Sequence, residues 1–161
     1  MGSTRTYHAP LHGAITLDGE DPVEALLTEL IETSVFQRLR RIRQLGPASL
    51  IFHGAETSRF THSLGVMAVA RLAFDRLAKL HPKLRPHRAT VLCAALLHDT
   101  GHGPFSHTAE EVFNSHHEQW TMAIVKRLPA VRSLLDNFDV TLWQSIQQVY
   151  THTHPIPCVW Q

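Results

Sequence analysis

One segment restricts the fold of this chain more than any other. Residues 89–97 read Ala-Thr-Val-Leu-Cys-Ala-Ala-Leu-Leu and have almost no polar side. Alanine and leucine favour a helix over a strand, and a helix that is apolar on every side must be covered by other elements. The segment therefore predicts a central, buried helix with the rest of the fold packed around it.

Apolar residues recur at three- and four-residue steps in several other segments, which is typical of helices with one buried face. The first segment follows Asp21-Pro22 and reaches Thr33, and a second is capped by Ser34 and ends at Gly46-Pro47. We expect further helices at residues 63–80, 121–128, 131–138 and 141–150. The side chains of helix 63–80 expected to face the core are Val66, Val69, Ala70, Ala73, Leu77 and Leu80. The tryptophans expected to pack in the core are Trp120, Trp143 and Trp160.

The first twenty residues depart from this periodicity. They contain His12-Gly13 and Asp18-Gly19, pairs that favour turns, and predict a short hairpin or irregular segment that contributes little to the core. No repeat or linker follows, so residues 21–161 are expected to form one all-α domain in which helices pack on helices. The chain stops in an apolar stretch at residues 158–161, as though cut inside an element.

The overall charge excludes some classes of function. Fifteen basic residues against fourteen acidic ones give a net charge of +1, too balanced for a general nucleic-acid or membrane-surface binder. Cys93 and Cys158 lack the spacing of a disulfide framework, and no apolar run approaches the roughly 20 residues that span a bilayer. We therefore expect a cytoplasmic protein without disulfides, in which any recognition of phosphate is local.

Histidines gather where the apolar helix ends. The chain has thirteen histidines, and the dipeptide His98-Asp99 comes directly after residue 97, before a glycine-rich break at residues 100–104. An imidazole and a carboxylate at the end of a core helix are costly to bury unless they are paired, and a metal ion satisfies both. For the dipeptide alone, a hydrogen-bonded structural pair is the simpler alternative.

Further candidate ligands and proton carriers surround this dipeptide. His62 lies at the start of the long helix, and two packed helices can bring it close to His98. Arg59, three residues earlier, can aim a guanidinium at phosphate oxygens. The segment with Gly103-Pro104 is too irregular for one straight helix, so the groups that follow can curl around the same point. These groups are His102, His107, Glu110 and His117, and they suit a phosphate-ester hydrolysis that needs a metal-activated water and a general acid.

Three ordered motifs resemble a known family. They are Phe-Gln-Arg-Leu-Arg-Arg-Ile-Arg-Gln-Leu-Gly at residues 36–46, Arg-Phe-Thr-His-Ser-Leu-Gly at 59–65 and Leu-His-Asp-Thr-Gly-His-Gly-Pro-Phe-Ser-His at 97–107. Their order and spacing closely resemble the HD-domain deoxynucleoside triphosphate triphosphohydrolases. The resemblance runs from about His12 to the end of the chain.

The resemblance implies an all-helical HD fold that hydrolyses a deoxynucleoside triphosphate to the deoxynucleoside and intact inorganic triphosphate. By motif position it implies that His62, His98 and Asp99 are metal ligands. It implies a catalytic role for His102, His107, Glu110 and His117, with His107 as general acid, although the family often has aspartate at the position of Glu110. It implies that Gln44 and Leu45 contact the deoxyribose, that Arg59 binds the triphosphate, and that the full-length protein forms a homo-oligomer.

One part of the family pattern is missing. The fourth metal ligand of the family is an aspartate in a later motif, which should begin just beyond Gln161. We therefore expect an incomplete HD domain, truncated before that ligand, with little or no turnover of its own. Asp136 and Asp139 are the nearest alternatives, but they are expected to be solvated or capping residues.

Several alternatives stay open at this point. Another HD phosphohydrolase would act on a nucleoside monophosphate, an alarmone or a cyclic dinucleotide. A non-catalytic regulatory or nucleic-acid-binding HD module is less favoured. Its support is the missing fourth ligand and the basic segment Arg38–Arg43. Those arginines could instead serve an oligomer interface, and the simplest expectation for them is a solvated face. Nitrogen and carboxylate ligands suit manganese, iron, zinc, nickel or magnesium. The histidines expected to be solvated or hydrogen-bonded, and not ligands, are His8, His12, His53, His81, His87, His116, His152 and His154.

Overall fold

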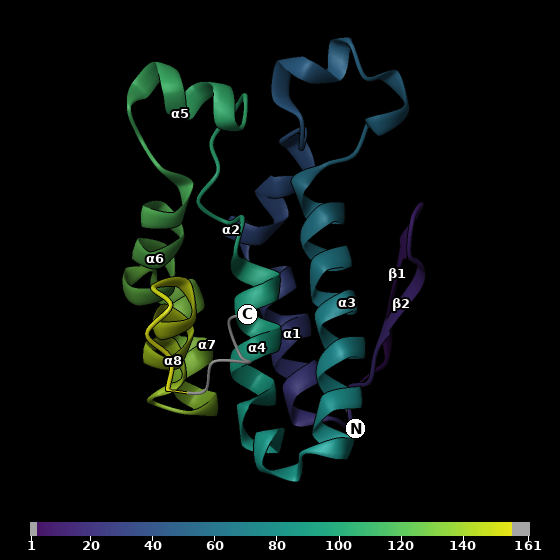
Figure 1. The fold of residues 1–161 in the computed structure, drawn as a ribbon, viewed down its shortest axis with the longest axis vertical. Helices are drawn as coiled ribbons and strands as arrows, with labels where there is room; N and C mark the ends of the chain where they lie inside the picture. Colours follow the sequence, from purple (N-terminus) through teal and green to yellow (C-terminus); the bar gives the residue numbers. More distant parts are fainter. Residues whose placement is uncertain (1–2, 156–161) are drawn as a thin grey trace.

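Helices α3 (Arg59–Leu80) and α4 (Arg88–Leu97) form the centre of the fold (Figure 1). The computed structural model describes residues 3–155. A short 3-10 segment, η4 (Pro82–His87), joins the two helices, which run side by side in opposite directions. The start of α3 and the end of α4 therefore lie at the same end of the bundle.

Helix α4 is buried, as its apolar sequence predicts. Leu92, Cys93 and Leu97 have no exposed surface. The helix packs against α3, α1 (Pro22–Glu32) and α8 (Leu142–Tyr150). Neighbours on several sides explain why a helix without a polar face is stable here.

The other predicted helices, apart from the one expected after Ser34, are also present with small shifts at their ends. Helix α1 begins where expected, because the side chain of Asp21 accepts hydrogen bonds from two backbone amides of the first turn. Near the C-terminus, α6 (His117–Arg127), α7 (Pro129–Phe138) and α8 pack against one another. A short helix that the pattern does not predict, α5 (His107–Phe113), stands at the end where α3 begins (Figure 1). The all-α prediction is thus confirmed, apart from the small sheet described next.

The N-terminal segment is a regular β-hairpin. Strands β1 (Arg5–Ala9) and β2 (Gly13–Leu17) pair antiparallel, and Gly13 adopts a φ of +67° at the turn. The expectation that this segment adds little to the core is wrong. Ile15 is 2% exposed and Leu17 is fully buried, because alternate residues of β2 face the helices.

The second predicted helix is broken. Residues expected to be helical from 35 to 45 form the short helix α2 (Ser34–Gln37) and the 3-10 turn η1 (Arg38–Arg41), after which Ile42 is extended. Two backbone bonds hold this extension: Arg59 N–H donates to Ile42 O, and Gln44 N–H donates to Thr57 O. The chain continues through two further 3-10 turns, η2 (Gly46–Leu50) and η3 (His53–Ala55).

The predicted core face of α3 is also wrong. Val69, Leu77 and Leu80 are exposed, although their spacing is helical. The buried side chains of the helix include larger ones from a neighbouring stripe, namely Phe60, Leu64, Met67 and Phe74. Because both stripes repeat at three- and four-residue steps, periodicity alone cannot choose between them, and burial of the larger side chains removes more apolar area from water.

The cysteine and tryptophan predictions have mixed outcomes. Cys93 is a free, buried thiol, while Cys158 and Trp160 lie outside the described residues. Trp120 is 58% exposed and lines a pocket together with His102, which contradicts its predicted place in the core. Trp143 packs partly against the core, and Arg132 lies 4.3 Å from its ring centre.

No helix among residues 3–155 combines the length and the apolar character needed to cross a membrane.

Arg88 joins three elements through charge. Its guanidinium lies 3.0 Å from Asp21 Oδ2, 2.8 Å from Glu24 Oε1 and 2.9 Å from Asp75 Oδ1. Burial lowers the pKa of Arg88, but the hydrogen bonds and charges of these carboxylates outweigh it and raise the pKa above its ordinary value. The start of α4 is therefore fastened to the start of α1 and to α3.

Replacing Arg88 by methionine should lower the free energy of unfolding by about 2 kcal/mol, measured by urea denaturation. The loss is below the roughly 3–5 kcal/mol for breaking a fully buried pair, because the Arg88 side chain is 19% exposed. The control is Arg43→Met, which removes the exposed pair with Glu56 and a hydrogen bond to Ser49 and should cost about 1 kcal/mol or less. Equal losses in the two variants would contradict a structural role for Arg88.

Candidate functional site

Three candidate metal ligands meet where α3 begins and α4 ends. One ligand atom from each of His62, His98 and Asp99 can be chosen so that all lie within 4.8 Å of one another. Asp99 Oδ1 lies 3.2 Å from His98 Nε2, and Asp99 Oδ2 lies 3.7 Å from His62 Nε2. We refer to these residues as the first cluster. The antiparallel packing of α3 and α4 brings together residues that are distant in the sequence.

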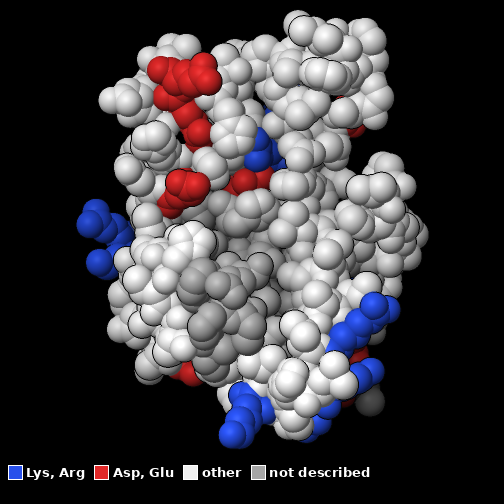
Figure 2. Space-filling model, in the orientation of Figure 1, with Lys and Arg blue, Asp and Glu red and all other residues white. Residues whose placement is uncertain are grey.

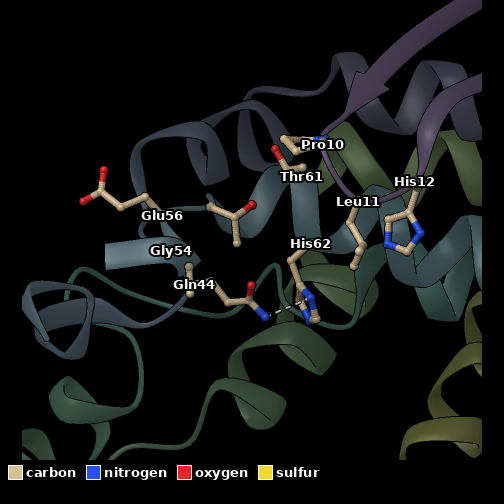
Figure 3. A pocket seen from close by; sticks show the side chains of 10 residues that line it. Pro10, Leu11, His12, Gln44, Gly54, Glu56, Thr61 and His62 are labelled. Carbon is tan, nitrogen blue, oxygen red and sulfur yellow. Dashed lines mark hydrogen bonds between the residues drawn. The ribbon is translucent and has the colours of Figure 1, made fainter. Parts of the chain in front are cut away.

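The surroundings of the two imidazoles suit metal binding. His98 Nδ1 lies 2.9 Å from the carbonyl oxygen of Ala95. A carbonyl only accepts, so Nδ1 carries the proton and Nε2 presents its lone pair toward Asp99. Gln44 Nε2 donates to His62 Nδ1 at 2.9 Å (Figure 3). Metal binding through His62 Nε2 requires the Gln44 amide to turn, so that its oxygen accepts from Nδ1–H. Burial lowers the pKa of His62 despite the nearby Asp99, which favours the neutral ring that a metal requires.

Asp99 is buried beside a permanent positive charge. Arg59 Nη1 lies 2.5 Å from Asp99 Oδ2, and the side chains of both residues are almost fully buried. Burial raises the pKa of the Asp99 carboxyl, but His102, His98 and Arg59 outweigh it and hold the pKa well below its usual range. Asp99 is therefore an anion, as a carboxylate must be to bind a metal.

Arg59 lies inside the site but is not free. Besides Asp99, its guanidinium donates to the hydroxyl of Ser106 and to the backbone oxygen of Gln44, at 3.1 Å for the latter. Ser106 in turn donates to the same Gln44 oxygen. Arg59 thus joins α3, the end of α4 and the extended segment before η2.

A second cluster adjoins the first and is organised by one carboxylate. Glu110 Oε2 lies 2.9 Å from His107 Nδ1, and Glu110 Oε1 lies 2.7 Å from His117 Nδ1 and 2.8 Å from the His117 backbone nitrogen. The ring of His102 stacks on that of His117 at 3.8 Å. Burial raises the pKa of Glu110, but the hydrogen bonds from His107 and His117 outweigh it and bring the pKa to about 2. We refer to these four residues as the second cluster.

His102 is the member of the second cluster that adjoins the first. Its ring is fully buried, with Nε2 3.5 Å from Asp99 Oδ1 and Nδ1 3.6 Å from Glu110 Oε1. These separations exceed normal hydrogen bonds, and neither nitrogen has a hydrogen-bond partner among the described residues. Burial lowers the pKa of His102, so the ring is neutral at neutral pH. The two clusters form one continuous polar site.

The glycine-rich turn is held by residues that the sequence analysis missed. Arg38 donates to the backbone oxygens of His102, at 2.7 Å, and Thr100. Thr121 donates to His98 O and accepts from the Gly101 amide, both at 2.9 Å. The prediction that Arg38 lies on a solvated face is therefore wrong. No local signal distinguishes it from the exposed Arg40, Arg41 and Arg43, because its partners lie more than 60 residues away.

A pocket opens beside the first cluster. Gln44 and His62 line it together with Pro10, Leu11 and His12 of the hairpin turn (Figure 3). Leu45, the other residue expected to contact a sugar, lies at the start of η2 and is not among the residues that line this pocket. The hairpin thus contributes a wall of the site, which the sequence analysis did not anticipate.

Known proteins provide an independent comparison. The family described as HD domain matches residues 59–157, more than half of the chain. The chain belongs to the HD domain family. The matched region contains every residue of the two clusters, while Gln44 and Leu45 precede it.

The relatives of this HD domain are longer proteins. The uncharacterized protein YwfO of Bacillus subtilis is 45% identical over 155 residues, which cover 96% of this chain and 35% of that protein. The human protein named deoxynucleoside triphosphate triphosphohydrolase SAMHD1 is 46% identical over 110 residues, covering 66% of this chain and 17% of that protein. The crystal structure of a hypothetical protein from Aquifex aeolicus matches 98% of this chain and 40% of that one, with 28% identity and a TM-score of 0.74. This HD domain therefore spans little more than a third of the YwfO protein and less than a fifth of SAMHD1.

Two carboxylates of the HD domain have other partners. Asp136 forms an ion pair with Arg132 at 2.8 Å on α7. Asp139 follows that helix and accepts from the backbone nitrogen and hydroxyl of Thr141, both at 2.7 Å. These contacts agree with the expectation that neither residue is the fourth ligand of the first cluster.

Proposed function

We propose that this HD domain is the metal-binding part of a phosphohydrolase that converts deoxynucleoside triphosphates to deoxynucleosides and inorganic triphosphate. The observation that carries the proposal is the contact between two clusters, one suited to holding a metal and one suited to moving a proton. The substrate class rests on the motif resemblance and on the similarity to proteins named deoxynucleoside triphosphate triphosphohydrolase SAMHD1.

The first cluster would hold the metal through His62, His98 and Asp99. When bound, a divalent or transition metal ion supplies Lewis-acid polarisation of a phosphate oxygen and lowers the pKa of a water molecule. These ligands are pre-organised for metal binding, because a hydrogen bond to Ala95 O orients the His98 ring and Arg59 keeps Asp99 ionised. Manganese, iron, zinc, nickel and magnesium remain the candidates.

The second cluster would carry the proton. Water attacks the α-phosphorus, the bond from phosphorus to the 5′ oxygen breaks, and the leaving oxygen takes a proton from His107. The side chain of His107 is 63% exposed, so a substrate can reach it. The ionised carboxylate of Glu110 holds His107 through Nδ1 and directs Nε2 outward. On the buried side, His117 hydrogen-bonds to Glu110 and the ring of His102 stacks on that of His117.

Three residues are proposed to contact the nucleotide. Gln44 and Leu45 would lie against the deoxyribose, where a close fit excludes a 2′-hydroxyl. Arg59 would face the triphosphate. Through its contacts with Asp99 and Ser106, Arg59 would also keep Asp99 ionised and oriented. We also propose that the longer protein assembles as a homo-oligomer.

A product assay tests this function. Each deoxynucleoside triphosphate is mixed with the manganese-loaded chain at high protein concentration, and the phosphorus products are followed by NMR. We expect slow accumulation of inorganic triphosphate that stops on dialysis against a chelator and returns with manganese, because the metal ligands are needed in every turnover. Formation of pyrophosphate or orthophosphate would contradict the proposed bond cleavage.

A binding assay covers the case in which turnover is too slow to detect. Deoxynucleoside triphosphates should raise the melting temperature of the metal-loaded chain more than nucleoside monophosphates, alarmones or cyclic dinucleotides do. Preferential stabilisation by one of these other nucleotides would favour a different HD phosphohydrolase.

The alternative role in nucleic-acid binding has weaker support. Of the exposed arginines, Arg40 stacks over the Phe60 ring at 3.6 Å, and Arg43 pairs with Glu56. Steep salt dependence of binding to single-stranded nucleic acid would be the sign of such a role.

A further inference from the structure

We propose that the second cluster is itself a metal site, formed by His102, His107, Glu110 and His117, and that a transition metal bound there inhibits the enzyme. The site would take an ion that prefers nitrogen, such as Zn²⁺. One potential ligand atom from each of the four residues can be chosen so that all lie within 4.8 Å of one another. The inhibitory effect rests on the proposed function, whereas the binding site does not.

The donor atoms select the kind of ion. Three imidazoles and one carboxylate form a set that suits tetrahedral Zn²⁺ and related transition metals. Magnesium and calcium prefer oxygen ligands and would bind poorly. Glu110 is ionised and already draws His107 and His117 together, so an ion needs only small ring rotations to replace the hydrogen bonds that now link them.

A second, independent observation is the buried ring of His102. Its side chain has no exposed surface, and neither ring nitrogen has a hydrogen-bond partner among residues 3–155. A buried polar group without a partner costs free energy. Nδ1 faces Glu110 Oε1 at 3.6 Å, so an ion between these atoms would satisfy it.

The first and second clusters do not compete for the same nitrogen. His102 faces Asp99 with Nε2 and Glu110 with Nδ1. His107 and His117 do not belong to the first cluster. An ion in the second cluster therefore leaves His62, His98 and Asp99 available for another.

Access and surface charge also favour a cation. His107 is largely exposed, and the second cluster faces a pocket that Phe113 and Trp120 also line. Figure 2 shows acidic side chains gathered over α5 and the start of α6. Glu111 and Glu118 are exposed on these helices, and such a surface raises the local concentration of cations.

The consequence is a metal dependence with two phases. Occupation of the first cluster would support hydrolysis. Occupation of the second cluster would engage the nitrogens of His107 and His117 and the oxygens of Glu110, so the proton could no longer be delivered. Excess zinc should then inhibit the manganese-loaded enzyme.

The decisive experiment counts bound ions without any substrate. The metal-free chain is titrated with Zn²⁺ by equilibrium dialysis and with Co²⁺ by visible absorption. We expect two ions per chain. His107→Ala and Glu110→Gln should each weaken one of them at least about tenfold, and His98→Ala should weaken the other. The His107 side chain is exposed, so its loss should not disturb folding, which circular dichroism checks.

The control is His116→Ala, which removes a histidine next to the second cluster but outside both groups and should leave two ions. A single ion in the unmodified chain, or two ions of unchanged affinity in His107→Ala and Glu110→Gln, would overturn the second site. Two ions without inhibition by zinc would overturn the inhibitory role. Because the count needs no nucleotide, failure of the product assay leaves the binding result intact.

Discussion

Replacing Asp99 by asparagine should remove the metal from the first cluster and also destabilise the fold. The amide is a poor metal ligand, so affinity should fall at least about a hundredfold, beyond the effect typical of changes around the ligands. The variant also leaves the buried charge of Arg59 without its anion, which costs about 3–5 kcal/mol. Metal content by mass spectrometry and urea denaturation measure the two effects.

A double variant separates these effects. Arg59→Met together with Asp99→Asn removes both charges, so most of the lost stability should return while metal binding stays absent. If Asp99→Asn kept its metal content, Asp99 would not be a ligand. If the double variant were as unstable as Asp99→Asn, the buried ion pair would not explain the loss of stability.

Replacing Gly101 by alanine should displace the start of α6. A methyl group at Gly101 would lie 2.0 Å from His117 O and 2.5 Å from Thr121 N, which backbone atoms cannot tolerate without moving. We expect a loss of about 3 kcal/mol in the free energy of unfolding, at the upper end for overpacking. Because α6 carries His117, hydrolysis should also fall by about a hundredfold, as for a displacement of about 1 Å in a catalytic group.

Gly103→Ala is the matched control for this prediction. It lies in the same turn, but no atom comes within 4 Å of the position of its added methyl group. Its stability should change by no more than about 0.5 kcal/mol, and its activity should be nearly unchanged. Equal effects of the two substitutions would show that the turn is generally sensitive to alanine and that contact with α6 is not the cause.

Some features of this HD domain can be predicted from local sequence. The apolar run before His98-Asp99 implies a buried helix because no other environment covers all its sides. Asp21-Pro22 marks the start of α1 because capping depends only on residues within one turn. The glycine-rich break at residues 100–104 likewise indicates that His102 and His107 leave the helix axis.

Other features depend on contacts between distant residues. Phe36 and Ile42 have helical spacing, yet Ile42 is extended because its carbonyl bonds to the amide of Arg59. Helix α3 has two apolar stripes of similar period. The stripe with the larger side chains is the one buried against the rest of the fold. No local pattern contains this information.

The candidate site shows the same division. The residues able to bind a metal or carry a proton can be read from the sequence, because these properties belong to the side chains of His62, His98, Asp99 and Glu110. The burial of Arg59 against Asp99 and the hydrogen bonds of Arg38 to the turn depend on how the elements pack. The same is true of His102, whose buried ring nitrogens have no hydrogen-bond partner among residues 3–155. The physical reason is that the partners, burial and charge environment of a side chain depend on elements that only folding brings together.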